Sequence, residues 1–438
     1  MVSIDNRLKR TLVAGSLSLA GAFAPFESHG QSAFTSNADR QDQIVARIAE
    51  QEAQYGPYSP QLLESWTDLA RLYHDDRNRA LEAAAIAQAL QISHATYGLY
   101  SLEQVPLLQQ MLRSHDELGD ASGVWELERE LMELAEKHPL DPRTASIWAG
   151  IADRRMDVFA RYLAGQKPVE LVLGCYYGQP NCNAGSRSVA LAAMFVDAQS
   201  KYERAVRTLI RQKPYDIEGL RALDTKIVLS SYKYRERALG GYNSGTSGRG
   251  YNSGVRALQR LYAYAQVTGE PAPAKAAALV QVADWNTLYA ANTDRAGWSP
   301  TDQRPAEAFA SYQQAYDLLQ RDRASPETID ELFAPAVPVV LPAFAPNPLT
   351  EQPEAGATGF IDVAFDITKY GRSADIRVLD TSTNASRSAK NRLTRLIMVS
   401  RFRPQAVHGR LDTSHVVLRY YLNEPITLVQ AASDIRTD

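Results

Sequence analysis

The chain of 438 residues has few cysteines, few histidines and almost no excess charge, and each shortage argues against a class of function. The seven histidines form no H-x-x-x-H pair, so we expect no metal site. A formal net charge of −3 lacks the basic face that a nucleic-acid partner requires. No G-x-x-x-x-G-K-[ST] phosphate loop occurs, and no G-x-S-x-G motif. The sequence therefore predicts no cofactor and no nucleic-acid partner.

One short motif of a known enzyme class does occur. The run Ser230-Ser231-Tyr232-Lys233 matches the S-x-x-K of serine β-lactamases, but their S-D-N and K-T-G motifs are absent. The run lies in a charged stretch with helical periodicity. We therefore predict that the protein is not an enzyme. An enzyme with an unrecognised site in the middle helical region is the alternative.

Only two cysteines are present, Cys175 and Cys182, and the segment between them is rich in turn-forming residues. In an exported protein a local disulfide closing this loop is the expected state. A metal or redox pair is the alternative. The spacing is not C-x-x-C and no histidine lies near.

The N-terminal 30 residues have the pattern of a secretory signal. Arg7, Lys9 and Arg10 precede an uncharged apolar stretch over residues 11–24, and small residues follow. A membrane-spanning helix needs about 20 residues, more than this stretch provides. We expect a signal peptide over 1–30, cleaved after Gly30 or after an earlier alanine, and a periplasmic protein. A short buried or membrane-anchoring helix is the alternative.

Residues 38–325 show helical periodicity. Leu62, Trp66, Leu69 and Tyr73 recur at spacings of three and four, which places them on one face of a helix. A second helix is expected from about residue 80 to 93. The opening Tyr-Gly-x-Tyr-Ser at 55–59 then recurs at 97–101, a period of 42. A repeated helix pair of this length predicts a solenoid, in which each pair buries its apolar face on its neighbours.

These residues resemble a tetratricopeptide repeat of the long kinesin-light-chain type. The matching residues are Trp66-Thr67-Asp68-Leu69-Ala70 with Leu72-Tyr73 in the first helix and Ala89-Leu90 with Ile92 in the second. Glu82 departs from the pattern, because a small residue is expected there. A later unit fits again with Trp285, Leu288 and Tyr289, then Ala308, Tyr312 and Ala315. Between about 145 and 270 no clean repeat is visible.

Two segments are expected to lack regular structure. Residues 240–254 contain Gly-Tyr-Asn-Ser-Gly twice and predict a flexible loop between helices. Seven prolines fall between residues 326 and 353. Proline removes backbone donors and breaks helices, so residues 326–356 are predicted to form a stiff, extended linker.

After the linker the hydrophobic period changes to two. Ile361, Val363, Phe365 and Ile367 alternate with polar or small residues, which indicates a half-buried strand. A turn at 369–372 leads to a second strand with Ala374, Ile376 and Val378 predicted inward. A helix is expected at about 386–400 and a third strand at 416–422. The predicted fold is mainly α: a tetratricopeptide-like α-solenoid followed by a small α+β (ββαβ) domain.

The domain at 357–424, before a tail at 425–438, resembles the C-terminal domain of TonB. The resemblance rests on Gly359, Ile361, Val363, Phe365, Gly371, Ile376, Val378, Arg401-Phe402-Arg403-Pro404 and Gly409. It implies that the domain binds an extended segment of an outer-membrane receptor by adding it to a sheet edge. The last strand is then the expected edge, with His415, Val417, Arg419 and Tyr421 facing away from the core.

The sequence departs from the TonB family at its N-terminus, where energy transducers carry a membrane-spanning helix. We therefore expect a periplasmic protein-interaction protein, with protein partners such as an outer-membrane receptor. The alternative is an atypical energy transducer held in the membrane by an uncleaved N-terminal segment.

Residues 357–424 hold eleven Lys and Arg against six Asp and Glu, a net charge of +5, which leaves −8 for the rest. This favours a basic recognition domain on an acidic scaffold; solvated surface charge is the alternative.

Overall fold

The computed structural model describes residues 37–166, 187–239, 247–290, 302–345, 347, 349, 357–407 and 409–422. The expected signal peptide, the Cys175–Cys182 pair and the tail at 425–438 lie outside the described residues. Within these ranges no helix has the length and apolarity to cross a membrane. The helices of the N-terminal part are α1 (Asn37–Tyr55), α2 (Gln61–Asp75), α3 (Arg79–Tyr97), α4 (Val105–Glu117), α5 (Ala121–Lys137), α6 (Arg143–Leu163), α8 (Arg187–Ile210), α9 (Ile217–Leu239), α10 (Ser247–Val267), α11 (Ala272–Tyr289), α12 (Arg304–Arg321) and α13 (Pro326–Phe333).

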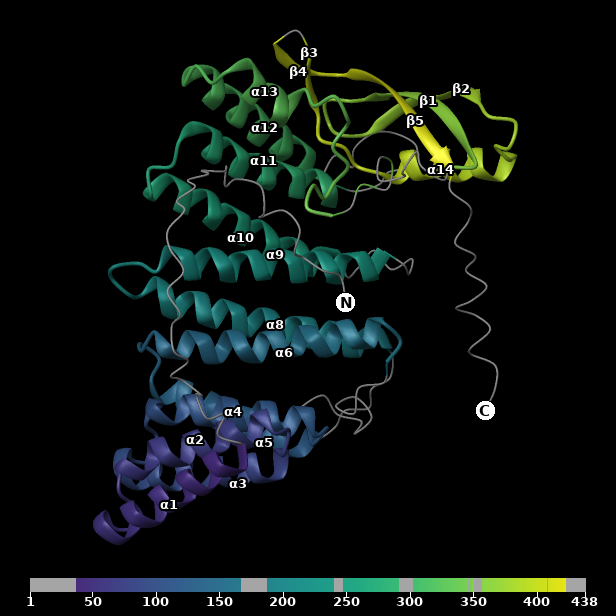
Figure 1. The fold of residues 1–438 in the computed structure, drawn as a ribbon. Coiled ribbons are helices and arrows are strands. Elements are labelled where there is room, and N and C mark those ends of the chain that lie inside the picture. Colours follow the sequence, from purple (N-terminus) through teal and green to yellow (C-terminus); the bar gives the residue numbers. More distant parts are fainter. Residues whose placement is uncertain are drawn as a thin grey trace, which may run out of the picture.

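The helices stack as antiparallel pairs in chain order, α2 with α3, α4 with α5, α6 with α8, α9 with α10 and α11 with α12 (Figure 1). One continuous apolar cluster runs through the stack, from Ile48 in α1 to Tyr289 in α11. The predicted face of the first pair is confirmed, since Leu62, Leu69 and Ile86 are buried. Each pair thus buries its apolar face on its neighbours, as expected of a solenoid.

The period of 42 residues corresponds to a repeated turn. Gly56 and Gly98 each follow a helix and each has φ of +86°, a conformation that glycine adopts without steric cost. The next helix of each unit begins a few residues later, at Gln61 and, after a 3₁₀ turn (Leu102–Gln104), at Val105. The repeated Tyr-Gly-x-Tyr-Ser sequence therefore forms the same bend of the chain in two successive units.

Buried ionic groups occupy positions between the helix pairs. Glu82, which departs from the repeat pattern, is 1% exposed and accepts hydrogen bonds from Arg79 of its own helix at 2.9 Å and from Gln110 of α4 at 3.3 Å. Further along, Arg155 donates to both carboxylate oxygens of Glu128, at 3.0 and 2.5 Å. Burial raises the pKa of Glu128, and Arg155 opposes that shift. Pairs of this kind hold adjacent helices in one arrangement, because a displaced partner would leave a buried charge.

The prediction of a loop over 240–254 is wrong in its second half, because α10 begins at Ser247. Gly250 and Gly254 lie inside this helix at places where neighbours come close. A Cβ on Gly254 would lie 2.1 Å from the Trp285 ring, and one on Gly250 would lie 2.9 Å from the Ser231 carbonyl oxygen. The glycines let α10 pack tightly on α9 and α11.

The predicted linker at 326–356 is also partly wrong. Its first eight residues form α13, in which Pro326 follows the capping residue Ser325 and occupies a first-turn position that needs no backbone donor. Phe333 at the end of α13 is fully buried. Residues 339–341 then run as a short extended segment, in which the Leu341 N–H donates to the Arg401 carbonyl and the Val339 carbonyl accepts from the Arg403 N–H. The segment is therefore packed into the fold instead of separating two bodies.

The C-terminal domain contains β1 (Gly359–Ile367), β2 (Ser373–Thr381), α14 (Arg387–Val399), β3 (Gln405–Val407), β4 (Arg410–Asp412) and β5 (Ser414–Leu422). The main sheet has the order β2-β1-β5 with antiparallel neighbours. Ile361, Val363, Phe365 and Ile367 are fully buried against α14, as predicted. Val378, predicted inward, is 41% exposed. The β1–β2 register shifts between Asp362 and Val363, which moves this part of β2 off the expected alternation.

The C-terminal domain packs against the last helices of the stack (Figure 1). Its β3–β4 hairpin, which the sequence did not predict, places Leu411 in one apolar cluster with α11, α12 and α13. Within the extended segment, Val339 and Leu341 pack on the helical core, whereas Val340 between them packs on the sheet core. This alternation makes the segment a shared wall between the two parts.

Candidate binding surfaces

Strand β5, which contains the four predicted site residues, lies at one edge of the three-stranded sheet. Val416 is buried and Leu418, Tyr420 and Leu422 pack on the sheet core. His415, Val417 and Arg419 are exposed and Tyr421 is half-buried, so the predicted alternation of the strand is confirmed.

The main chain of these four residues points away from β1. In β1 the Phe360 carbonyl accepts from Ser382 N, so the polar groups of Phe360 face β2. The main-chain N–H and C=O groups of successive residues point to alternate sides of a strand, and the β1–β5 register is regular. The main-chain groups of residues 362, 364 and 366 therefore also face β2. Phe360 and residues 362, 364 and 366 pair in β5 with Tyr421, Arg419, Val417 and His415, respectively. The N–H and C=O groups of these four residues therefore face the open edge.

The solvent face of this edge is held by cross-strand ion pairs. Arg419 donates to both oxygens of Asp362 at 2.8 Å, and its guanidinium lies 4.2 Å from the centroid of the Phe360 ring. The hydrogen bond from Arg419 lowers the pKa of Asp362. His415 Nδ1 lies 2.8 Å from an Asp366 carboxylate oxygen. The Arg419 and His415 side chains are thus both engaged by β1, and neither blocks the edge.

The two outer strands of the sheet differ in regularity. β5 pairs with β1 in one unbroken register from Ser414 to Leu422. β2 has two register shifts against β1, and Asp375 within it has φ of +47°. Bulges protect a sheet edge from pairing with another strand. The regular β5 edge is therefore the better template for an added strand.

The Arg401-Phe402-Arg403-Pro404 segment is buried and contacts the rest of the fold instead of solvent. Phe402 packs on Phe365 of the sheet, with ring centroids 5.3 Å apart. Arg403 reaches α11, where it donates to the Asp284 oxygens at 3.1 and 2.7 Å. Burial alone would lower the pKa of Arg403, but Asp284 raises it above its ordinary value.

Asp284, the partner of Arg403, and Tyr312, which also contacts Asp284, were not predicted from the sequence to be site residues. Tyr312 of α12 is fully buried and donates to Asp284 Oδ1 at 2.7 Å. Burial, followed by the Asp284 charge, raises the pKa of Tyr312 well above its ordinary value. The available signal was a carboxylate inside the apolar run Val282-Ala283-Asp284-Trp285, because a buried charge requires a partner.

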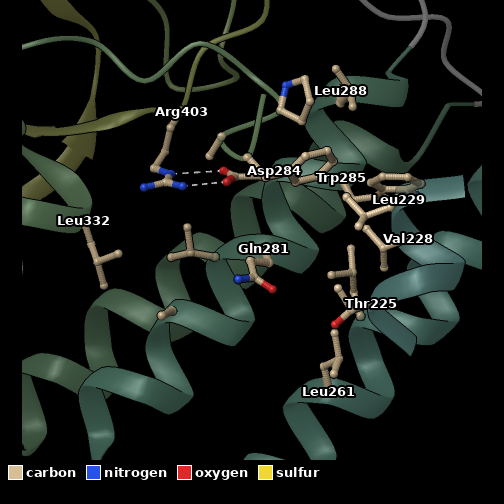
Figure 2. Close-up of a pocket in the computed structure, with 16 residues that line it drawn as sticks. Thr225, Val228, Leu229, Leu261, Gln281, Asp284, Trp285, Leu288, Leu332 and Arg403 are labelled. Carbon is tan, nitrogen blue, oxygen red and sulfur yellow. Dashed lines mark hydrogen bonds and ion pairs between the residues drawn. The ribbon is translucent and has the colours of Figure 1, made fainter. Parts of the chain in front are cut away.

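A hollow of about 370 Å³ lies beside this ion pair, where the stack meets the C-terminal domain (Figure 2). Its floor is apolar and includes Val228 of α9, Leu261 of α10 and Trp285 of α11. Residues 342–344 close one side. The volume and the apolar lining with one polar end are typical of a site for a ligand or an apolar side chain.

A second hollow of about 230 Å³ lies between α4, α5 and α6, and Arg113 and Arg154 line it. Helices α6 and α9 are linked across the stack by Lys226, which donates to Asp153 at 2.6 Å. The two hollows lie in different parts of the stack, one lined by α4, α5 and α6 and the other mainly by α9, α10 and α11.

The residues considered for catalysis do not assemble a site. Ser230 Oγ accepts from Gln199 at 2.7 Å and donates to the backbone of its own helix, and Lys233 is exposed. Within the described ranges, no group of three or more His, Cys, Asp or Glu could hold a metal ion.

No model of a known protein family and no curated protein matches this chain. Among solved structures it is similar to a Podosopora anserina protein with nearly identical tetratricopeptide-like repeats, named for the kinesin light chain. The identity is 13%, covering 62% of this chain and 96% of that chain, with a TM-score of 0.30. It is also similar to the C-terminal part of a tetratricopeptide-repeat protein from Cytophaga hutchinsonii. That identity is 13% too, covering 67% and 95%, with a TM-score of 0.22. With TM-scores this low, neither likeness carries an argument about function.

Proposed function

We propose that this chain is an exported, non-catalytic protein-interaction protein of the bacterial envelope. Its C-terminal domain binds an extended peptide, and its helix pairs bind a protein partner. The observation that carries the proposal is the β5 edge, whose register is regular over nine residue pairs and whose outer main-chain groups face away from β1. The TonB resemblance of residues 357–424 supports a peptide of the outer-membrane receptor type.

Binding at this edge is strand addition. The N–H and C=O groups of Val417, Arg419 and Tyr421 pair with the main chain of the incoming peptide, which supplies affinity without regard to sequence. Selectivity comes from side chains on the solvent face, where Val417 is 61% exposed. The Asp362–Arg419 pair lies on the same face and fixes the Arg419 guanidinium beside the added strand.

The part of the stack that carries the two hollows is the second proposed surface. Its two hollows are lined by different chemistry, one by apolar side chains beside an ion pair and the other by Arg113 and Arg154. A partner that spans both would present an apolar side chain to the first and an acidic group to the second. Because the C-terminal domain packs on the last helices through a shared apolar cluster, one packed unit carries both surfaces.

The test is a proline scan of the edge in the full-length chain, because removing residues 357–422 would expose the apolar faces of α11 and α12. Val417→Pro deletes one outward donor and leaves the β1–β5 ladder intact. We expect affinity for the captured envelope partner to fall about five- to tenfold. This is the change expected from losing one main-chain hydrogen bond and slightly distorting the strand. Val417→Ala should change affinity much less.

Leu379→Pro is the matched control, since it places the same residue in the bulged part of β2, where Leu379 is 57% exposed. All variants should retain the circular dichroism of the wild type. A folded Val417→Pro chain that captures the same envelope proteins with unchanged affinity would show that the edge is not the site. N-terminal sequencing of the mature protein separates this proposal from an energy transducer, which requires retention of residues 1–30.

A further inference from the structure

One long edge of the helical stack is formed by the loops that join one helix pair to the next. The loops at 56–60, 98–101, 138–142, 211–216 and 268–271 follow α1, α3, α5, α8 and α10. Adjacent loops touch: His138 Nε2 lies 2.6 Å from the Tyr100 carbonyl oxygen, and Gln212 donates to the Leu140 carbonyl at 2.5 Å. This loop edge lies on the side of the stack away from the C-terminal domain (Figure 1).

Large apolar side chains are concentrated on the loop edge. Of the twenty-one such side chains that are exposed in the described ranges, nine lie in these loops or on the residue just before them. They are Tyr55, Tyr58, Tyr97, Leu99, Tyr100, Leu140, Ile210, Tyr215 and Val267. Val267, Leu99 and Leu140 are 73%, 66% and 63% exposed, the three highest values among the twenty-one. Single exposed apolar residues are ordinary, but a row of them along one edge marks an interaction surface.

Charges on the loop edge leave this row accessible to an anionic surface. Asp141 is engaged by Arg143, Asp216 accepts from the Gly219 amide, and Glu270 pairs with Arg221. Arg211 and Lys213 lie in the same loop as Tyr215 and are exposed, and neither has an ionic partner in the part of the chain that the structure describes. Two of these three carboxylates are thus paired with arginines, while the cations Arg211 and Lys213 remain available.

We propose that the loop edge lies on a lipid bilayer, with its apolar tips inserted at the headgroup boundary. Tyrosine suits this position, because its ring is apolar and its hydroxyl remains hydrated. Peripheral proteins bind through this combination of buried apolar area and attraction to anionic lipids. A protein partner fits less well, because no residue of these loops lines either of the two hollows described above.

The test is co-sedimentation of the full-length chain, without residues 1–30, with vesicles of phosphatidylethanolamine and phosphatidylglycerol. The wild type should pellet with the vesicles. The triple variant Leu99→Ser, Leu140→Ser, Val267→Ser should bind at least roughly tenfold more weakly, because each insertion contributes buried apolar area. Arg211→Gln with Lys213→Gln should weaken binding to these vesicles and have little effect with phosphatidylcholine alone.

The matched control is Leu118→Ser, Met398→Ser, Val399→Ser, which removes three apolar side chains of similar exposure, 56–60%, away from the loop edge. This control should bind vesicles as the wild type does. A wild-type chain that stays in the supernatant overturns the proposal, and so does an equal loss in both triple variants. Capture of envelope proteins by the β5 edge is independent of these residues, so the two proposals fail separately.

Discussion

Arg403 before β3 and Asp284 in α11, 119 residues apart in sequence, form a two-pronged ion pair between the C-terminal domain and the helical stack. Both side chains are about nine-tenths buried. Tyr312 adds a third hydrogen bond to the same carboxylate. Because Leu411 of the β3–β4 hairpin packs beside this network in the cluster of the last helices, the domain and the stack share one interior. We expect them to unfold together.

The first prediction concerns the stability of this junction. Asp284→Ala leaves the Arg403 guanidinium buried without its counter-charge and removes the acceptor of Tyr312. We expect a loss of about 3–5 kcal/mol in the free energy of unfolding, the usual effect of removing one partner of a buried pair. Urea unfolding followed by circular dichroism measures it.

The control is the double variant Asp284→Leu, Arg403→Met, which replaces both charges by apolar side chains. It should be more stable than Asp284→Ala, because no unpaired charge remains buried. A double-mutant cycle compares the stability losses of the two single variants with the loss of the double variant. If the single losses simply add, the two positions are not coupled, and the pair does not hold the junction.

The parts of the fold that repeat over short distances could be predicted from the sequence. The face of α2 follows from the spacing of Leu62 and Leu69, and the buried face of β1 from the alternation of Ile361 to Ile367. Both patterns report which side of one element meets water. The four β5 residues were predicted in the same way, and the structure adds the direction of their main-chain groups.

The junction could not be predicted, because nothing in the local sequence pairs Asp284 with Arg403. The error in the linker has a local cause: Ser325 before Pro326 is a helix-start signal, and the proline count obscured it. The β3–β4 hairpin has strands of three residues, too short for an alternation pattern. Val378 was misplaced because a bulge in β2 changes the alternation without a sequence signature.

The second prediction uses the close packing of α10 on α11. Gly254→Ala would place a methyl group against the Trp285 ring, where an ideal Cβ lies 2.1 Å from Cζ2. We expect a loss of about 1–3 kcal/mol from overpacking, despite the higher helix propensity of alanine. Gly150→Ala in α6 is the control: no atom lies within 4 Å of its Cβ, so it should gain about 0.5–1 kcal/mol. Equal effects at the two positions would contradict the packing argument.

The third prediction concerns pH and the β1–β5 ladder. The hydrogen bond from Arg419 lowers the pKa of Asp362, so its stabilising effect is complete above about pH 4, the ordinary pKa of aspartate. It is lost as pH falls through the lower pKa of the folded state. Arg419→Gln should have only a small effect on stability at pH 7, because the guanidinium is half exposed and solvent screens the pair.

The difference between wild type and Arg419→Gln in urea unfolding should therefore shrink as pH falls from about 5 to 2.5. A constant part should remain, since the contact of Arg419 with the Phe360 ring does not titrate. A difference that stays the same throughout this range would mean that the ion pair contributes nothing to the strand pairing.

The last prediction concerns the β1–β2 turn, which rests on the helical stack. Gly371 has φ of +72°, and a Cβ there would lie 2.2 Å from the Phe402 carbonyl oxygen and 2.6 Å from Thr287 Cγ2 of α11. Gly371→Ala therefore adds a steric conflict to a backbone strain of about 1–2 kcal/mol. Gly269→Ala should have the backbone strain without the steric conflict, because Gly269 has φ of +69° and no atom lies within 4 Å of a Cβ placed there.

The two variants thus differ by the contact with α11, and we expect Gly371→Ala to lose about 1–3 kcal/mol more in urea unfolding. Trypsin gives a local readout, because Lys369 and Arg372 flank the glycine. Cleavage in this turn should accelerate in Gly371→Ala under native conditions and stay slow in Gly269→Ala, since local opening exposes the turn without global unfolding. If both variants lose the same stability and the turn is cut at the wild-type rate, the turn is not held by the stack, and Arg403, the β3–β4 hairpin and the 339–341 segment join the two parts without it.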